Sequence, residues 1–124
     1  MRAFLLVAAG GALGATLRYA AALAVARFHS GTFPLATVLI NIVGCLAIGL
    51  VLGTVGEHPL ADPDLRRFLV TGFLGGFTTF SAFGYETIDL LRRGSTGAAL
   101  ANVALSVGLG LAAVAIGLRF SRLI

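Results

Sequence analysis

The chain has 124 residues, of which 58% are hydrophobic and only 11% are charged. Its mean hydropathy is +1.00. A soluble domain usually carries about 25% charged residues, so this composition excludes one. About 20 apolar residues cross a bilayer, and about four such spans fill the chain, which leaves no room for a separate soluble domain.

The net charge is +4, but the chain contains no lysine and no basic run longer than two residues. Nucleic-acid binding needs a clustered basic face, so no nucleic-acid partner is expected. The arginines are interpreted as anchors at the lipid interface. The single cysteine, Cys45, lies in an apolar stretch and cannot form an internal disulfide.

The first predicted span covers residues 3–26 and contains small residues spaced for close helix packing, from Gly10 to Gly14. Arg18 lies well inside this span. A buried guanidinium is a candidate functional group, and the alternative is that it extends to the nearer interface.

The second predicted span covers residues 35–56, and its only strongly polar interior side chain is Asn41. An amide at this depth must form hydrogen bonds, either to a neighbouring helix or to a permeant species. Gly49 and Gly53 predict another packing face on the same span.

The third predicted span covers residues 65–91, and its centre disfavours a continuous helix. The run from Gly72 to Phe83 contains three glycines, the adjacent Thr78 and Thr79, and a serine. Backbone that leaves the helix in hydrocarbon must find other partners, so we expect a break that lines a cavity or holds an ion. The alternative is a continuous buried helix whose glycines admit close neighbours.

Two acidic residues, Glu86 and Asp89, fall in the last turns of the third span, just before Arg92 and Arg93. We expect both acids to pair with these arginines along the helix. The loop before this span, from Glu57 to Asp64, is polar and rich in proline.

The fourth predicted span covers residues 98–118, with Asn102, Ser106 and Gly110 on one face because they are four residues apart. The predicted fold is therefore an all-α membrane protein with four transmembrane helices, the third broken at its centre. All 124 residues form one domain. His29 and His58 lie in loops without further ligands at metal spacing, so neither predicts a metal site.

No group of residues forms a catalytic arrangement, so an enzyme is not expected. The spans carry hydrogen-bond donors, and no carboxylate lies near the middle of any span. Transport of an anion or a neutral solute is therefore favoured over cation or proton-coupled transport. Small four-helix multidrug exporters depend on a glutamate in the first span, whereas the first acid here is Glu57. That class remains an alternative, as does a non-transporting accessory subunit of a membrane complex.

Three motifs resemble those of the small fluoride channels of the CrcB/Fluc family. They are the runs Gly75–Ser81 and Thr37–Gly44, and the pattern between Gly10 and Tyr19. The resemblance covers three spans and nearly the whole chain. It implies a passive fluoride channel that protects a prokaryotic cell and resides in its plasma membrane. It also implies an antiparallel homodimer with two pores.

The resemblance further implies which residues form the site. The predicted pore-lining residues are Asn41, Thr79, Phe80, Ser81, Phe83 and Ser106. Backbone carbonyls of Gly75 and Thr78 would bind a structural sodium ion. Two departures from the family pattern are Ala82 and Gly110, which stand where many members have a hydroxyl residue. Aromatic ring edges are positive, so phenylalanines facing a pore would attract a small anion without trapping it.

The arginines are divided almost evenly between the two predicted sides of the membrane. One side has Arg2, Arg66, Arg67, Arg119 and Arg122, and the other has Arg27, Arg92 and Arg93, with Arg18 left out. Since this five-to-three division is a weak bias for the positive-inside rule, we expect insertion in both orientations. Both orientations of one chain would then pair as an antiparallel homodimer.

Overall fold

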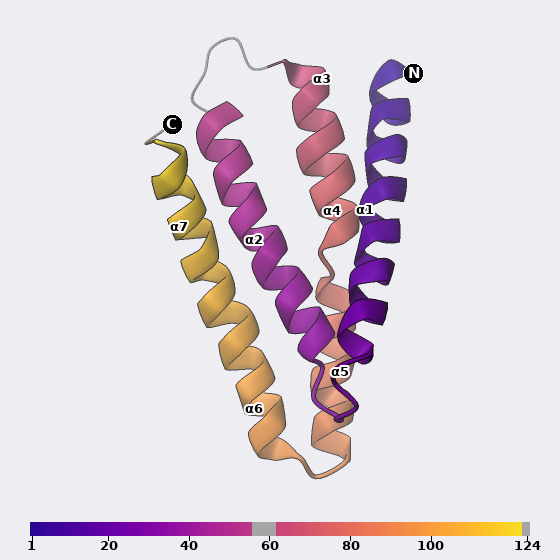
Figure 1. Ribbon diagram of the computed structural model, residues 1–124, viewed down its shortest axis with the longest axis vertical. Coiled ribbons are helices and arrows are strands. Elements are labelled where there is room, and N and C mark those ends of the chain that lie inside the picture. The colour runs from indigo at the N-terminus through magenta and orange to yellow at the C-terminus, as the bar shows by residue number, and fades with distance from the viewer. Residues whose placement is uncertain (56–61, 123–124) are drawn as a thin grey trace.

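A computed structural model describes residues 1–55 and 62–122 of the chain, and within them every regular element is helical (Figure 1). The elements are α1 (Arg2–Ala26), α2 (Leu35–Val55), α3 (Pro63–Arg66), η1 (Arg67–Leu74), α4 (Gly75–Phe77), α5 (Phe80–Arg92), α6 (Thr96–Ala104), η2 (Leu105–Leu109) and α7 (Gly110–Ser121). The two segments η1 and η2 are π-helical, with wider turns than an α-helix. Most of the predicted loop from Glu57 to Asp64, including His58, lies outside the described residues.

These elements join into four helices long and apolar enough to cross a membrane. They are Arg2–Ala26, Leu35–Thr54, Pro63–Arg92 and Thr96–Ser121. The described residues thus confirm an all-helical chain with four candidate spans. The start of α1, the start of α3 and the end of α7 lie at one end of the molecule, and the α1–α2 and α5–α6 turns lie at the other (Figure 1).

Glycines allow α1 to pack backbone to backbone against η1 and α4. Gly10 and Gly14 are both buried, and an added Cβ at either would clash with a backbone carbonyl, that of Phe68 or Phe73 respectively. The predicted packing face of the first span is therefore confirmed. It belongs to a contact within the subunit, between the first and third spans.

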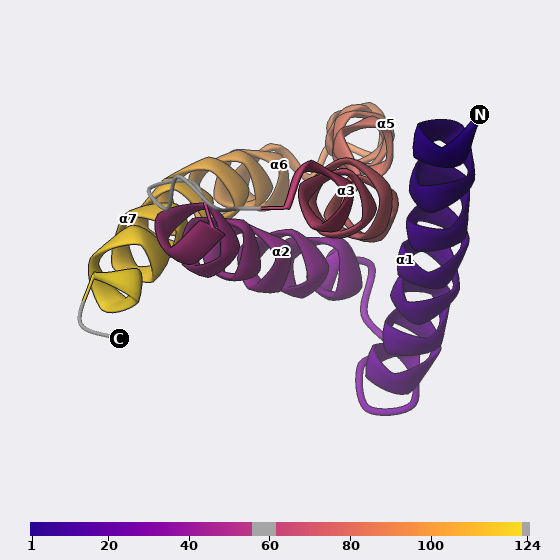
Figure 2. The same cartoon turned by 90° about the horizontal axis from the view of Figure 1, so that it is seen from above.

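A second glycine contact joins α2 to α7. A Cβ at Gly49 would lie 3.1 Å from the Cα of Gly117, and one at Gly53 would clash with the side chain of Ser121. This confirms the packing face predicted on the second span. α5 and α6 pack together across a tight turn at Gly94, whose φ of 75° favours glycine. Seen from above, α3 and α5 lie between α1 and α7 (Figure 2).

Two extended residues separate α4 from α5 (Figure 1). Thr78 has φ −78° and ψ 159°, and Thr79 has φ −149° and ψ 113°. The phenylalanines near this interruption fall into two groups. Phe77 is buried and stacks on Phe73, with ring centroids 6.2 Å apart, whereas Phe80 begins the next helix. Phe77 is therefore separated by extended backbone from the helix that carries Phe80.

The acidic residues at the end of the third span differ in their partners. Asp89 pairs with Arg93 at 2.7 Å, as the sequence predicted. The prediction for Glu86 is wrong, because its Oε1 accepts a hydrogen bond of 2.8 Å from the Thr37 hydroxyl on α2. Glu86 lies on the face of α5 that meets α2, and Asp89 already engages Arg93. The other oxygen of Glu86, Oε2, is buried and has no hydrogen-bond partner among the described residues.

Candidate functional site

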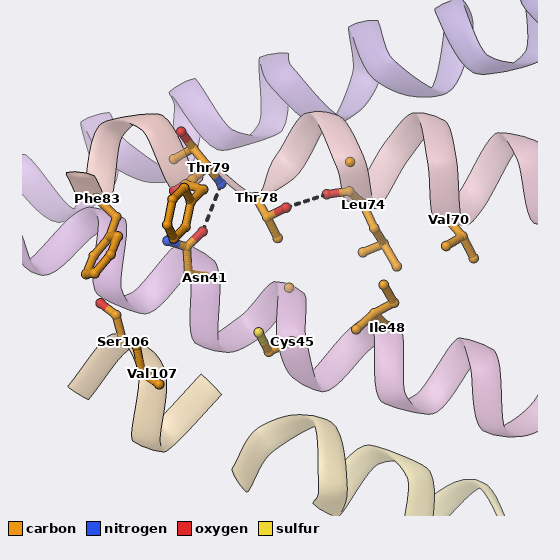
Figure 3. A pocket seen from close by; sticks show the side chains of 13 residues that line it. Asn41, Cys45, Ile48, Val70, Leu74, Thr78, Thr79, Phe83, Ser106 and Val107 are labelled. Carbon is orange, nitrogen blue, oxygen red and sulfur yellow. Dashed lines mark hydrogen bonds between the residues drawn. The ribbon is translucent and has the colours of Figure 1, made fainter. Parts of the chain in front are cut away.

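A cavity of about 330 Å³ lies beside the interruption of the third span. It is lined by Asn41, Gly44, Cys45, Ile48, Val70, Leu74, Gly75, Thr78, Thr79, Phe80, Phe83, Ser106 and Val107. Asn41, Thr79 and Ser106 lie towards one end of the lining, and Ile48 and Val70 lie at the other (Figure 3). The cavity therefore has a polar end and an apolar end.

Two reciprocal hydrogen bonds join Asn41 to the backbone of Thr79 at the polar end. The Nδ2 group of Asn41 donates to the Thr79 carbonyl at 3.0 Å. The Thr79 N–H donates to the Oδ1 of Asn41 at 2.9 Å, the dashed line in Figure 3. An extended residue presents both groups away from the helix axis, where a side-chain amide can pair with them. The NH2 group has two hydrogens, so one of them is not used by the Thr79 carbonyl.

The same contacts change how two backbone carbonyls are paired. In a continuous helix the Thr79 N–H would donate to the Gly75 carbonyl, and the Ala82 N–H would donate to the Thr78 carbonyl. Here the Thr79 N–H donates to Asn41, and the Ala82 N–H donates to the Thr79 hydroxyl at 3.3 Å. Both carbonyls thus lose the donor that a helix would supply.

Gly75 differs from Gly72 and Gly76, the neighbouring glycines before the interruption. Gly72 and Gly76 pack against α1, where an added Cβ would lie 2.8 Å from the Val7 carbonyl or 2.6 Å from the Gly11 carbonyl. At Gly75 an added Cβ would meet nothing closer than 3.7 Å. Gly75 is also exposed. Packing within the subunit therefore does not explain why position 75 is a glycine.

The aromatic part of the site is a pair of phenylalanines on α5. The rings of Phe80 and Phe83 have centroids 5.5 Å apart and are inclined by 45°. Phe80 is 82% exposed, whereas Phe83 is half-buried. The side chain of Phe83 lies near those of Asn41 and Ser106 (Figure 3).

A chain of hydrogen bonds connects two residues that line this end of the cavity, Phe83 and Ser106. Asn102 is fully buried, with 0% exposure, and its Nδ2 donates to the Thr87 hydroxyl at 2.8 Å. The Thr87 hydroxyl donates to the Phe83 carbonyl at 2.7 Å. Ser106 donates to the Oδ1 of Asn102 at 3.4 Å, so the predicted shared face of Asn102 and Ser106 is confirmed. The chain links α5 to the fourth span.

The cavity brings together five of the six residues predicted to line a pore. They are Asn41, Thr79, Phe80, Phe83 and Ser106. Ser81 is not part of the lining; it is exposed, and its Oγ lies 3.4 Å from the Thr79 Oγ1. Arg18 also lies away from the cavity, and it has no hydrogen-bond or ion-pair partner among the described residues.

Sequence reasoning missed the apolar lining and Thr87. Ile48, Val70, Leu74 and Val107 lie in spans where most residues are apolar, so nothing in the sequence distinguishes them. Thr87 had a weak signal, because it lies four residues after Phe83 on the same helix face.

The lining of the cavity includes Gly75 and Thr78, the two residues whose carbonyls are predicted to bind sodium. Within residues 1–55 and 62–122, no group of three or more His, Cys, Asp or Glu side chains could hold a metal ion. The carbonyls of Gly75 and Thr78 lack the donors that a continuous helix would give them, and carbonyl oxygens are possible ligands for a cation.

The four apolar helices and the cavity at the interrupted span define a small helical membrane protein with a largely apolar cavity that has one polar end. Comparison with known proteins gives the particular family. The chain belongs to the CrcB family, since the model described as "CrcB-like protein, Camphor Resistance (CrcB)" matches residues 5–118.

Several bacterial relatives match over nearly their full length. The chain is 47% identical to the fluoride-specific ion channel FluC of Rhizobium etli, covering 95% of this chain and 94% of the relative. It is 42% identical to the FluC protein of Methylobacillus flagellatus, covering 96% and 94%. It is 44% identical to that of Flavobacterium psychrophilum, covering 98% of both chains.

Proposed function

We propose that this protein is a channel for passive fluoride efflux through the plasma membrane of a prokaryotic cell. Family membership and the fluoride-specific relatives support this proposal. The structural observation that carries it is the free amide hydrogen of Asn41 in a cavity bordered by Phe80 and Phe83. None of the described residues that line this cavity is acidic, so no fixed negative charge there would repel an anion.

Fluoride is small and strongly hydrated, so each step through a narrow pore must replace water by other donors. The remaining Asn41 N–H and the Ser106 hydroxyl are such donors. Ser106 can release its present bond to Asn102 at little cost, because 3.4 Å is long for an O–H···O bond. Ring edges of Phe80 and Phe83 add weak attraction without tight binding. Weak sites in sequence suit conduction.

The remaining pore residues and the interruption are part of the same proposal. Thr79 and Ser81 form the polar surface around the interruption, and Ser81 contributes from its exposed side. We place this interruption at membrane depth, in a single four-span domain covering residues 1–124. Its polar backbone groups require partners there, which the Asn41 amide supplies in part.

The working form is proposed to be an antiparallel homodimer with two pores and a central structural sodium ion. The backbone carbonyls of Gly75 and Thr78 would hold this ion, and its charge would offset the repulsion between carbonyl dipoles of the two subunits. The open surroundings of Gly75 and the diverted donors of both carbonyls support this assignment.

The decisive experiment is fluoride efflux from liposomes that contain only this purified protein. A fluoride electrode should record rapid efflux once a potassium ionophore dissipates the membrane potential, and equal loading with chloride should give little efflux. An exporter of cationic drugs would release no fluoride under these conditions. An accessory subunit would conduct neither anion, so an absence of fluoride flux from correctly folded protein overturns the proposal.

A further inference from the structure

We propose that Asn41 is a positioning residue for the carbonyl site at the interruption, and that it connects this site to the pore. The inference rests on the proposed function, because the carbonyls of Gly75 and Thr78 matter only if they bind a cation. The carbonyls of Gly75 and Thr78 lose their helical hydrogen-bond donors because those donors bond to side chains instead. These side chains are those of Asn41 and Thr79.

Asn41 acts on the first carbonyl by occupying a donor. Its Oδ1 accepts the Thr79 N–H at 2.9 Å, and this N–H is the one that would otherwise close a helical turn onto the Gly75 carbonyl. Its Nδ2 holds the Thr79 carbonyl at 3.0 Å, which fixes the extended backbone of that residue. One planar amide thus satisfies both backbone groups of Thr79 and leaves the Gly75 carbonyl available.

Thr79 acts on the second carbonyl in the same way. Its hydroxyl accepts the Ala82 N–H at 3.3 Å, which is the donor that a continuous helix would give to the Thr78 carbonyl. Thr79 is thus the N-cap of α5, and Asn41 fixes the backbone of this N-cap. Both carbonyls therefore depend on one connected set of hydrogen bonds.

Asn41 also lines the cavity, and the second hydrogen of its NH2 group, which Thr79 does not use, can serve an anion there. Asn41 thus lies between the anion path and the cation site and takes part in both. The two roles share the Nδ2 group. The acceptor Oδ1 serves the carbonyl site, and the donor Nδ2 serves the pore as well as the Thr79 carbonyl.

Substitution can therefore separate the two roles only in part. Asn41→Leu has a similar size but neither donor nor acceptor, so the Thr79 N–H is free to return to the Gly75 carbonyl. Asn41→Asp keeps an oxygen acceptor for the Thr79 N–H but places negative charge in the anion path. Thr79→Val keeps the branched shape but removes the hydroxyl that holds the Ala82 N–H.

The test is the sodium dependence of thermal unfolding of the purified protein, with a bulky organic cation replacing sodium at constant ionic strength. At a sodium concentration c, a bound ion stabilises the folded protein by RT ln(1 + c/Kd), so the sodium concentration above which the unfolding midpoint begins to rise reports affinity. We expect Asn41→Leu and Thr79→Val to raise this concentration by at least about tenfold or to abolish the shift. Asn41→Asp should lose fluoride efflux and weaken the sodium shift less than Asn41→Leu does, because it keeps the acceptor for the Thr79 N–H but loses the donor to the Thr79 carbonyl.

Phe80→Ile is the matched control, because it alters the pore without touching the interruption's hydrogen bonds. It should keep the wild-type sodium response. A wild-type response in Asn41→Leu would overturn the inference and leave Asn41 as a pore residue only. If Asn41→Leu does not fold, Asn41→Asp decides, because it removes the donor to the Thr79 carbonyl, and a wild-type sodium response in it would overturn the inference. If the wild-type protein itself ignores sodium, the sodium assignment fails together with this inference, while fluoride efflux remains a separate measurement.

Discussion

At the scale of single residues, substitutions at Phe80 and Phe83 distinguish a pore surface on α5 from ordinary apolar packing. Isoleucine keeps much of the apolar volume but lacks the positive ring edge. We expect Phe80→Ile and Phe83→Ile each to reduce fluoride efflux by at least about tenfold, which corresponds to about 1.4 kcal/mol of lost stabilisation along the path.

Phe120→Ile is the control for this pair, since Phe120 is 58% exposed on α7 and lies outside the cavity. It should leave efflux unchanged. Packing alone would make all three substitutions nearly silent. Wild-type efflux in both pore variants would therefore remove the anion path from this face of α5.

Glu86 is a residue whose partner was predicted wrongly from the sequence. The sequence placed two acids beside two arginines, and helix spacing made an ion pair plausible for each. Spacing along one helix says nothing of the neighbouring helix, and α2 presents the Thr37 hydroxyl to Glu86. Asn41 was identified correctly as a polar group that needs partners. That its partners are both backbone groups of Thr79 required the geometry.

At the scale of helices, the glycine contact between α1 and the third span should be sensitive to a single methyl group. Gly14→Ala would bring a Cβ against the Phe73 carbonyl, so the helices must separate. We expect a loss of about 1–3 kcal/mol of stability, the usual cost of overpacking. Thermal unfolding in detergent, compared with wild type, measures it.

Gly97→Ala is the matched variant in a helix where nothing lies within 4 Å of an added Cβ. Alanine favours helix over glycine by about 0.8–1 kcal/mol, so this change should be neutral or stabilising. Equal destabilisation by both variants would mean that helix propensity or detergent effects, rather than the close contact with η1, determine the result.

The helical elements were largely predictable because long apolar stretches and small-residue spacing are local signals. The four spans and both glycine faces followed from them. The π-helical turns of η1 and η2 were not predicted. The composition of residues 72–83 favoured an interruption but did not select its two extended residues. At these two extended residues, the Asn41 amide and the Thr79 hydroxyl accept the N–H groups of Thr79 and Ala82.

At the scale of the whole molecule, both ends carry arginines and neither is strongly favoured for one side of a membrane. We expect the protein to insert in both orientations. Ser30 lies in the exposed turn after α1, so Ser30→Cys in a Cys45→Ala background gives one reporter position. An impermeant thiol reagent should modify about half of the molecules from each side of the membrane, as equal insertion requires.

The control for orientation is a variant with added charge, in which further arginines beside Ser30 should move labelling towards one side. Cells that carry only this variant should lose fluoride efflux if the working dimer is antiparallel. Labelling of the unaltered protein from one side alone would contradict both insertion in two orientations and the antiparallel pairing of one chain.

The bond between Asn41 and Thr79 joins positions 38 residues apart, and this order along the chain affects biogenesis. Synthesis proceeds from the N-terminus, so α2 is available in the membrane before the third span emerges. The extended backbone of Thr79 can therefore meet its amide partner as it enters hydrocarbon, where unpaired polar groups cost several kcal/mol. A permuted chain that made α2 last would expose those groups throughout insertion.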